Sequence, residues 1–264
     1  EGSHNIPQIE VAVGEELDGN TADPEQVRLR VALVFRHLSP LSQADVDSLS
    51  QFSVRHGFDL YLQPGGNDTV HKISPADGRE RLQYFLPEFD LELNAGINRK
   101  IISQALSLLQ LNEDDTVLDL FCGLGNFTLA TARRAKRVVG VEGSDEMVLR
   151  GEENAALNGL DNVEFHAADL FKPIADKPWA KLEYSKIILD PPRSGAIEII
   201  PEIVKLGAKT IVYISCNPAT LARDTAELIR AGYELRTVGV MDMFPHTTHV
   251  ESMAVFDAGK RVGR

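Results

Sequence analysis

From residue 94 onward, the chain alternates short apolar runs with segments of helical periodicity. Strands are predicted at residues 117–120, 137–141, 163–166, 187–189 and 210–214, with helices at 127–135, 146–157, around 199 and at 221–231. Strands that alternate with helices of this length predict an α/β fold with a parallel, doubly wound sheet. Ligands of such sheets bind outside the carboxyl ends of the strands, near the point where the strand order reverses. The residues that follow each strand are therefore the first candidates for a functional site.

The first 95 residues show a different, mixed pattern. Strands are predicted at residues 9–13, 27–35, 60–62, 69–73 and 82–86, with an acidic loop at 14–24 and a helix from the N-cap Ser42 to Gly57. This pattern predicts a smaller α+β lobe over residues 1–95, followed by the doubly wound domain over residues 96–264. The larger domain opens with a helical face (Ile101, Ala105, Leu108, Leu109) and closes with strands at 235–240 and 253–256.

Composition limits the partners and the compartment. The 264 residues carry a formal net charge of -12, which argues mildly against nucleic acid unless a local basic face holds the phosphates. The two cysteines, Cys122 and Cys216, are too few for a disulfide framework and favour a cytoplasmic location. No apolar run approaches the roughly 20 residues of a membrane span, so no membrane contact is predicted. The chain starts at Glu1 rather than Met, which predicts a fragment of a longer protein.

A glycine-rich turn follows the strand predicted at 117–120. Gly123 and Gly125 allow the backbone to approach a ligand closely, and the helix that begins after them adds oriented N–H donors. A dinucleotide would be one ligand for such a turn, but Thr128 occupies the place of the third glycine in the dinucleotide fingerprint. Asp119 lies just before the turn, where a carboxylate suits a cationic amino-acid ligand better than a pyrophosphate.

Two more carboxylates follow the next two strands. Glu142 closes the strand at 137–141 and is placed to accept hydrogen bonds from both ribose hydroxyls of a nucleoside. Asp169 follows the strand at 163–166 and is placed to reach an adenine amino group. Together with Asp119, these carboxylates predict an S-adenosylmethionine site on a Rossmann-like methyltransferase sheet. Cys122, inside the glycine turn, is interpreted as a small buried residue.

The following two strands end in residues that suit a carbon methylation. Asp190 starts an Asp-Pro-Pro-Arg segment, in which an acid without a neighbouring aromatic residue disfavours methylation of exocyclic amines. Arg193 of this segment is a candidate for a phosphate or base contact, and a plain surface arginine is an equal alternative. Cys216 ends the strand at 210–214 close to a helix N-terminus, which predicts a stabilised thiolate. A thiolate that adds to carbon 6 of uracil makes carbon 5 nucleophilic enough to accept a methyl group.

This chemistry also needs a base, because the proton on carbon 5 must leave before the thiolate is eliminated. His246, His249 and Glu251 lie close together before the last strand and are the candidates. Histidine titrates nearer neutral pH, but a carboxylate close to the adduct would also serve. The residues alone leave this choice open.

Three segments closely resemble the RNA uridine C5-methyltransferases. They are residues 118–128 (LDLFCGLGNFT), 215–224 (SCNPATLARD) and 242–253 (DMFPHTTHVESM). The last two look most like the branch of the family that acts on 23S ribosomal RNA. The resemblance runs strongly from about residue 94 to 256 and more weakly through 33–62, and three motifs agree in order and spacing.

The resemblance implies a role for individual residues. Cys216 matches the family's nucleophile and Glu251 the base that takes the carbon 5 proton. The positions that match the family's cofactor site are Phe121, Asn126, Glu142, Asp169 and Asp190, and Asp190 also lies near the target base. Glu92 stands where the family has a glutamine that contacts the cofactor; a carboxylate there can bind the methionine ammonium of the cofactor but lacks the amide donor of the glutamine.

The resemblance also implies two parts outside this chain: full-length members of the family contain a small RNA-binding barrel, followed by a cysteine cluster that holds an iron–sulfur centre. Cys122 and Cys216 are both placed elsewhere, so this chain is not expected to ligate that cluster or any other metal. The chain is therefore expected to bind S-adenosylmethionine but to bind its RNA substrate, 23S rRNA, poorly on its own. No obligate protein partner is inferred.

Three alternatives compete with this reading. A cytosine C5-methyltransferase uses the same thiolate addition, but its cysteine usually lies in a Pro-Cys or Thr-Cys setting, which the Ser-Cys-Asn-Pro segment at 215–218 does not match. A cofactor-binding fragment or scaffold without turnover is favoured slightly by Glu92 and disfavoured by the joint presence of Cys216 and Glu251. A dinucleotide oxidoreductase is weakened by the missing third glycine.

Overall fold

The computed structural model describes residues 6, 8–17, 27–65, 71–75, 95–241 and 250–259. The backbone divides into two compact units, Glu1–Asn98 and Arg99–Arg264, each with its own β-sheet. The division falls inside the helix α2 (Ala95–Leu109). Within the described ranges, no helix reaches the length and hydrophobicity that a membrane span requires.

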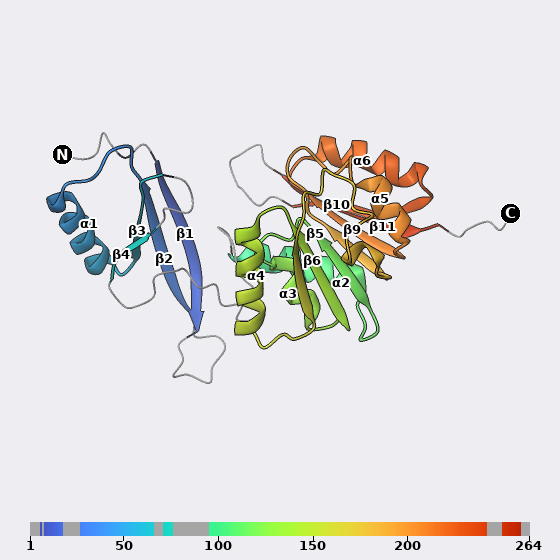
Figure 1. Ribbon diagram of the computed structural model, residues 1–264, viewed down its shortest axis with the longest axis horizontal. Helices are drawn as coiled ribbons and strands as arrows, with labels where there is room; N and C mark the ends of the chain where they lie inside the picture. The colour runs from blue at the N-terminus through green and yellow to red at the C-terminus, as the bar shows by residue number, and fades with distance from the viewer. Residues whose placement is uncertain are drawn as a thin grey trace. The chain divides into compact units, whose positions relative to one another are not determined.

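The smaller unit holds a four-stranded sheet in the order β1-β2-β3-β4 and one helix (Figure 1). Its elements are β1 (Gln8–Leu17), β2 (Val27–Arg36), α1 (Gln43–His56), β3 (Asp59–Gln63) and β4 (His71–Ser74). β2 and β3 are parallel because α1 carries the chain back between them, and the other neighbouring pairs are antiparallel. The helix limits agree with the prediction: the Asp45 N–H donates to Ser42 Oγ at 3.2 Å, and Gly57 closes the last turn.

Two details of this unit differ from the sequence prediction. β1 pairs with β2 as far as Leu17, so the ladder takes up the first part of the loop expected at 14–24. On α1 the apolar residues Phe52 and Val54 are 47% and 67% exposed, and Ser53 is the helix residue with no exposed surface, a detail that the predicted helix did not specify. The strand predicted at 82–86 lies outside the described residues.

The larger unit contains a seven-stranded sheet in the order β10-β11-β9-β8-β5-β6-β7. Its strands are β5 (Thr116–Leu120), β6 (Arg137–Glu142), β7 (Val163–Ala167), β8 (Lys186–Leu189), β9 (Thr210–Ser215), β10 (Tyr233–Met241) and β11 (Glu251–Ala258). The five strands from β9 to β7 are parallel, and the strand order reverses between β5 and β8. The predicted α/β fold with a doubly wound sheet is confirmed.

The last two strands are not parallel to the others. β11 lies antiparallel to β9, and β10 lies antiparallel to β11 at the sheet edge. Only residues 242–250 join β10 to β11, whereas a parallel pair needs a crossover of a dozen or more residues. The usual dinucleotide sheet carries a sixth parallel strand beside the fifth, so the antiparallel β11 in that place weighs against a dinucleotide fold.

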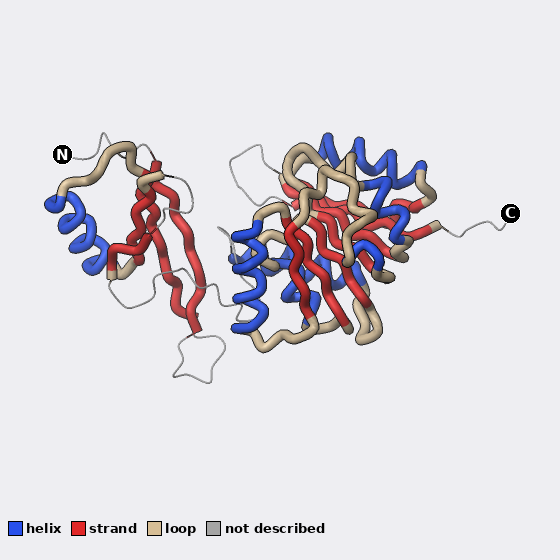
Figure 2. The backbone as a smooth tube through the Cα atoms, in the orientation of Figure 1, coloured by secondary structure: helices blue, strands red, loops and turns tan. Residues whose placement is uncertain are grey.

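Helices cover both faces of the larger sheet, as Figure 2 shows in blue around the red strands. They are α2 and then α3 (Asn126–Ala132), α4 (Asp145–Leu157), α5 (Ile200–Leu206) and α6 (Pro218–Arg230), with a short 3-10 helix at Trp179–Lys181. α4 packs along β6 and β7, and α6 packs along β9, β10 and β11. The core between the layers consists of fully buried residues such as Leu118, Val139, Ile187, Ile211 and Phe256. This rigid layer fixes the loops at the carboxyl ends of the strands.

Candidate active site

Five of the predicted site residues lie at the carboxyl ends of the five parallel strands. In strand order from β9 to β7 they are Cys216, Asp190, Phe121, Glu142 and Asp169. Parallel neighbours end at the same edge of a sheet, so these residues share one edge. Asp190 and Phe121 flank the reversal of strand order, and the Asp190 N–H donates to Leu120 O at 3.3 Å. The structure therefore brings the predicted residues to one edge of the sheet, on both sides of its switch point.

The loop between β5 and α3 makes a tight turn at this edge. Phe121 has φ 63°, an unusual conformation for a bulky residue, and Gly123 has φ 55°. Gly125 has φ 95°, and a Cβ there would lie 2.9 Å from Phe165 Cζ, so only glycine fits. Asn126 then begins α3. The turn thus connects the end of β5 directly to the N-terminus of α3, while the ligand contacts expected of it stay a prediction.

Asp119 lies below this loop and is fully buried. Its Oδ2 accepts a hydrogen bond of 2.6 Å from Thr128 Oγ1, while no described residue donates to its buried Oδ1. Burial raises the pKa of the Asp119 carboxyl to about 7, against the opposing effect of the Thr128 hydrogen bonds, and the Glu142 charge adds to the rise. Thr128, at the place of the third fingerprint glycine, thus serves as the partner of Asp119.

Glu142 closes β6 with its carboxylate fixed by backbone donors. Gly123 N–H donates to Oε2 at 3.1 Å, and the N–H groups of Gly143 and Ser144 donate to Oε1 at 2.7 and 3.2 Å. These bonds connect the end of β6 to the glycine turn. A carboxylate has about four acceptor positions, so capacity remains for hydroxyl donors of a ligand. The half-buried Glu142 is therefore both oriented and accessible.

Asp169 lies exposed after β7 and pairs with its own loop. Lys172 Nζ lies 2.9 Å from Oδ2, and the Phe171 N–H donates to Oδ1 at 3.0 Å. The Lys172 and Phe171 hydrogen bonds lower the pKa of the Asp169 carboxyl below its ordinary value. The Phe171 ring lies 5.8 Å from the ring of Phe121, centroid to centroid. Phe171 is thus an aromatic neighbour of the predicted residues that no sequence motif identifies, because a single exposed phenylalanine does not differ from an ordinary loop residue.

Cys216 and Glu251 lie opposite each other at the junction of β9 and β11. Ser215 pairs with Ser252 in the antiparallel ladder, so the next residue on each side of that pair is Cys216 and Glu251. Both side chains are half-buried. The two groups also interact electrostatically, because the Glu251 charge acts directly on the Cys216 thiol. Two residues 35 positions apart in the chain are thus brought together at the sheet edge.

The charge around Cys216 differs from the sequence expectation. Burial, the Glu251 carboxylate and the Asp190 carboxylate raise the pKa of the Cys216 thiol, and Arg193 opposes them. The predicted stabilisation of the thiolate is therefore wrong for the free protein. The loss of solvent and the two carboxylates act against the stabilisation expected from the N-terminus of α6, which begins two residues later at Pro218.

The remaining predictions concern residues outside the described ranges, Cys122 and metal binding. Glu92, His246 and His249 lie outside the described residues, so their proposed contacts stay predictions. Cys122 is 5% exposed and burial raises the pKa of its thiol well above the ordinary value, which agrees with its interpretation as a structural residue. Within the described ranges, no three His, Cys, Asp or Glu side chains form a group that could hold a metal ion.

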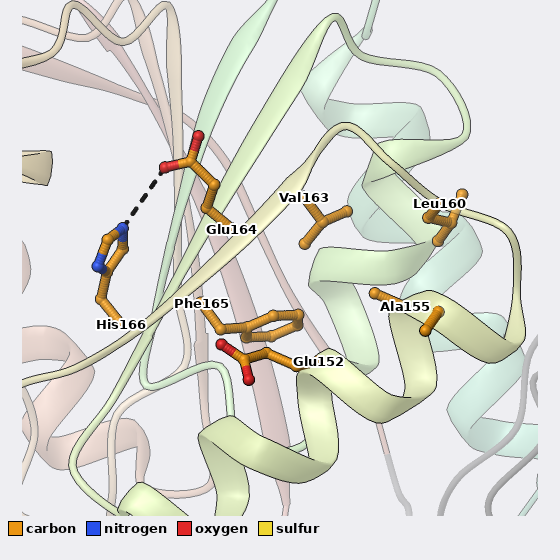
Figure 3. A pocket seen from close by; sticks show the side chains of 8 residues that line it. Glu152, Ala155, Leu160, Val163, Glu164, Phe165 and His166 are labelled. Carbon is orange, nitrogen blue, oxygen red and sulfur yellow. Dashed lines mark ion pairs between the residues drawn. The ribbon is translucent and has the colours of Figure 1, made fainter.

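A pocket of about 350 Å³ lies away from these residues, between α4 and β7 (Figure 3). Its apolar lining includes Ala155, Leu160, Val163 and Phe165. On its polar side Glu164 Oε2 lies 3.6 Å from His166 Nε2. No predicted site residue lines this pocket, and the candidate active site remains the carboxyl edge of the sheet.

Comparison with known proteins agrees with this geometry. The family model described as tRNA (Uracil-5-)-methyltransferase matches residues 66–258. The 23S rRNA (uracil(1939)-C(5))-methyltransferase RlmD of Alcanivorax borkumensis is 51% identical over 271 residues, covering 99% of this chain and 58% of that protein. The protein of the same name from Hahella chejuensis is 52% identical, covering 97% of this chain and 58% of its own length. The chain thus spans about 58% of the length of these relatives.

A solved structure shares the fold. The tRNA (uracil-54, C5)-methyltransferase of Pyrococcus abyssi, in complex with S-adenosyl-L-homocysteine, aligns with a TM-score of 0.63 at 23% identity, over 88% of this chain and 57% of that one. The sheet order and glycine turn define a Rossmann-like methyltransferase fold. Within that class, the chain belongs to the tRNA (uracil-5-)-methyltransferase family. The resemblance found in three sequence motifs is confirmed.

Proposed function

We propose that this chain is the catalytic part of an enzyme that transfers a methyl group from S-adenosylmethionine to carbon 5 of a uridine in RNA. The family match and the names of the RlmD relatives support this activity and favour 23S rRNA as the substrate. The single observation that carries the mechanism is the pairing of Cys216 with Glu251 at the edge that also holds the glycine turn. The cytoplasmic location stays a prediction.

The residues at the switch point fit S-adenosylmethionine. At Gly123 no protein atom lies within 4 Å of a Cβ position, which leaves space for a ligand to approach the backbone of the turn, and the buried Oδ1 of Asp119 before the turn has no described partner. When bound, S-adenosylmethionine supplies an electrophilic methyl group on a positively charged sulfur. Glu142 would accept hydrogen bonds from the ribose hydroxyls, and Asp169 would accept one from the adenine amino group. Phe121 and Asn126 complete the turn that faces the ligand.

Cys216 is the proposed nucleophile. Its thiolate adds to carbon 6 of the uracil ring, forming a carbon–sulfur bond and leaving a nucleophilic electron pair on carbon 5. That pair takes the methyl group from the sulfonium of the methyl donor. The raised pKa keeps the thiol mostly protonated in the free protein, so the thiol must give its proton to solvent water when substrates are in place. The positive charge of Arg193 lowers the pKa of Cys216 and so favours the thiolate.

Glu251 is the proposed base for the second half of the reaction. Its carboxylate takes the proton from the methylated carbon 5, and the electron pair of that bond restores the double bond as the carbon–sulfur bond breaks. Cys216 leaves as a thiolate, which then takes a proton back from solvent water. Because Glu251 lies opposite Cys216 in the β9–β11 ladder, it can reach the carbon next to the one that the sulfur holds.

The test is tritium release from RNA labelled at carbon 5 of uridine. Release that depends on both S-adenosylmethionine and Cys216 is expected, and Glu251→Gln should reduce it by about 100-fold or more, as the loss of a general base does. Release that continues in Cys216→Ala would contradict the covalent mechanism. As a control, Glu202→Gln changes a carboxylate on α5 that pairs with Lys205, and it should leave release unchanged.

The second candidate is a cofactor-binding fragment without turnover of its own. The observation in its favour is that the chain spans only about 58% of the length of its relatives. Isothermal titration with S-adenosylmethionine separates the two candidates when combined with the tritium assay. Binding without release at saturating RNA supports the fragment, whereas binding with release supports the enzyme.

A further inference from the structure

The loop after β8, residues 190–196, is fastened to α6 by a buried carboxylate. Asp224 of α6 has no exposed surface, and its Oδ2 accepts the Ala196 N–H at 2.7 Å. The same oxygen accepts the Tyr213 hydroxyl of β9 at 2.6 Å. Burial and the hydrogen bond to Asp224 raise the pKa of Tyr213 above its ordinary value, so this hydroxyl stays a donor. One carboxylate oxygen thus joins the loop, the helix and the central sheet.

Two further side chains hold the same loop: those of Arg223, near the middle of α6, and of Asn217, its N-cap. Arg223 Nε donates to Asp224 Oδ1 at 2.7 Å, and its Nη2 donates to Ser194 O at 2.8 Å. Asn217 caps α6 by accepting the Ala219 N–H at 3.2 Å. The remaining contact runs from Asn217 Nδ2 to Arg193 O at 3.1 Å. The backbone is therefore held at residues 193, 194 and 196.

Gly195 shows how closely the loop and the helix approach. A Cβ at this position would lie 2.4 Å from Arg223 Nη2 and 2.6 Å from Asp224 Oδ2, and its φ is 83°. Any larger side chain would therefore push the loop away from α6. The contact with α6 therefore fixes the middle of the loop, between the end of β8 and the buried Ala196.

The same helix carries the loop of the nucleophile. α6 begins at Pro218, two residues after Cys216. We propose that Asp224 is a positioning residue: by its direct bond to the loop and through Arg223, it holds Asp190 and Arg193 at a fixed place beside Cys216. This proposal rests on the proposed function only in taking Cys216 as the reactive group. The assignment goes to Asp224 rather than Arg223 because Asp224 touches the loop directly and also orients Arg223.

The loss of this anchor has a defined electrostatic direction. The charged groups that act on Cys216 are Glu251 at the start of β11 and Asp190 and Arg193 in the loop. Asp190 is also tied to Leu120 O at the end of β5, while the α6 contacts hold the part of the loop next to Arg193. Release of the loop therefore moves Arg193 first. Arg193 favours the thiolate, so its departure raises the pKa of Cys216 further.

The experiment is the pH dependence of iodoacetamide alkylation of Cys216, followed by peptide mass spectrometry in the absence of RNA and S-adenosylmethionine. Asp224→Asn keeps the shape of the side chain but replaces one acceptor oxygen with an NH₂ group. This donor cannot accept a hydrogen bond from Arg223 and repels it. The alkylation rate at pH 7.5 should fall about three- to tenfold, which corresponds to a rise of roughly half to one pKa unit. Arg193→Gln should show the same shift, and the double variant should show little more.

Matched variants separate positioning from loss of stability. Asp115→Asn removes a buried carboxylate that pairs with Lys186 at 2.7 Å at the opposite end of β5, so it should lower the melting temperature without moving the alkylation profile. Arg223→Gln alters a side chain that is 44% exposed, so it tests the same contact if Asp224→Asn does not fold. An unchanged profile in Asp224→Asn, or in Arg223→Gln where Asp224→Asn does not fold, would overturn the proposal, as would an equal shift in Asp115→Asn.

This readout is independent of the proposed function. A shifted alkylation profile together with absent tritium release would leave Asp224 as a positioning residue and refute the methylation mechanism. Normal tritium release together with an unshifted alkylation profile would support the methylation mechanism and refute the positioning role of Asp224.

Discussion

Four carboxylates of the candidate site lie in four different environments. Asp119 is fully buried, Glu142 is fixed by three backbone N–H groups, Asp169 is exposed beside Lys172, and Glu251 faces a thiol. Residues of one chemical type therefore reach the same edge of the sheet with different charge states and accessibilities. The sequence predicted that these residues end strands, but burial depends on packing from elements far along the chain.

The buried Asp119 makes stability depend on pH. Its folded pKa, about 7, lies above the ordinary 3.8, so the folded state binds more protons and stability falls as pH rises between these values. Asp119→Asn removes this penalty and keeps an acceptor for Thr128. Urea unfolding at pH 5 and pH 8 should show the variant gaining on the wild type by on the order of 3 kcal/mol at the higher pH.

Asp115→Asn provides the opposite case. Although burial alone would raise the pKa of Asp115, hydrogen bonds from Lys186 and Ser185 lower it. Its contribution to stability is therefore present above the ordinary pKa and lost as pH falls.

A gain of Asp119→Asn over the wild type that is the same at pH 5 and pH 8 would contradict the raised pKa of Asp119.

Glu251 controls the thiol as well as the proposed proton transfer. Because its charge raises the pKa of Cys216, Glu251→Gln should lower that pKa and shift the alkylation profile toward lower pH. The same variant should accumulate a covalent complex with ordinary uridine RNA, since the proton on carbon 5 is no longer removed. Denaturing gel electrophoresis would detect the complex. A variant with neither the shift nor the complex would show that Glu251 acts elsewhere.

At the scale of the element, the sequence predicted the strands and helices better than their arrangement. Ser42 and Gly57 marked the ends of α1, and each parallel strand was found within one or two residues. The antiparallel placement of β10 and β11 was missed, because apolar alternation does not reveal strand direction. The β8 loop contacts with Asp224 were also missed, since a hydrogen bond across 28 residues leaves no local pattern.

The glycine turn allows a direct test at this scale. Gly125→Ala combines a positive φ with a contact at 2.9 Å to Phe165, so it should destabilise the fold by about 2–4 kcal/mol and abolish cofactor binding. Gly159→Ala is the matched control, because Gly159 also has a positive φ, 63°, but no atom lies within 4 Å of a Cβ there. It should cost about 1 kcal/mol and keep binding. Titration calorimetry with S-adenosylmethionine measures the binding of both variants. An equal loss of binding in the two would contradict the proposal that the glycine turn holds the cofactor.

At the scale of the whole molecule, charge sets the expected behaviour toward RNA. The chain carries a net charge of -12 and spans about 58% of its relatives. Phosphate contacts provide most of the affinity of RNA-binding proteins and make it depend on salt. Family membership and fold could be predicted from three motifs, whereas the selecting RNA surface could not, because no motif of this chain identifies one.

The chain should therefore bind S-adenosylmethionine much better than RNA. Fluorescence anisotropy with an rRNA hairpin at about 150 mM salt should give only weak, nonselective binding, in the range of roughly 10⁻⁴ M or above. A hairpin with its uridine replaced by cytidine serves as the control. Tight binding that distinguishes the two hairpins would show that the selecting surface lies within these 264 residues.

The most direct measurement of the central claim is trapping with RNA that contains 5-fluorouridine, at saturating S-adenosylmethionine and RNA. Fluorine on carbon 5 cannot be removed as a proton, so the reaction should stop at the covalent complex. Peptide mass spectrometry should find the methylated nucleotide attached to Cys216, and Cys216→Ala should give no complex while it still binds S-adenosylmethionine. Attachment at another residue, or the absence of any complex in wild-type protein that binds both ligands, would contradict the account.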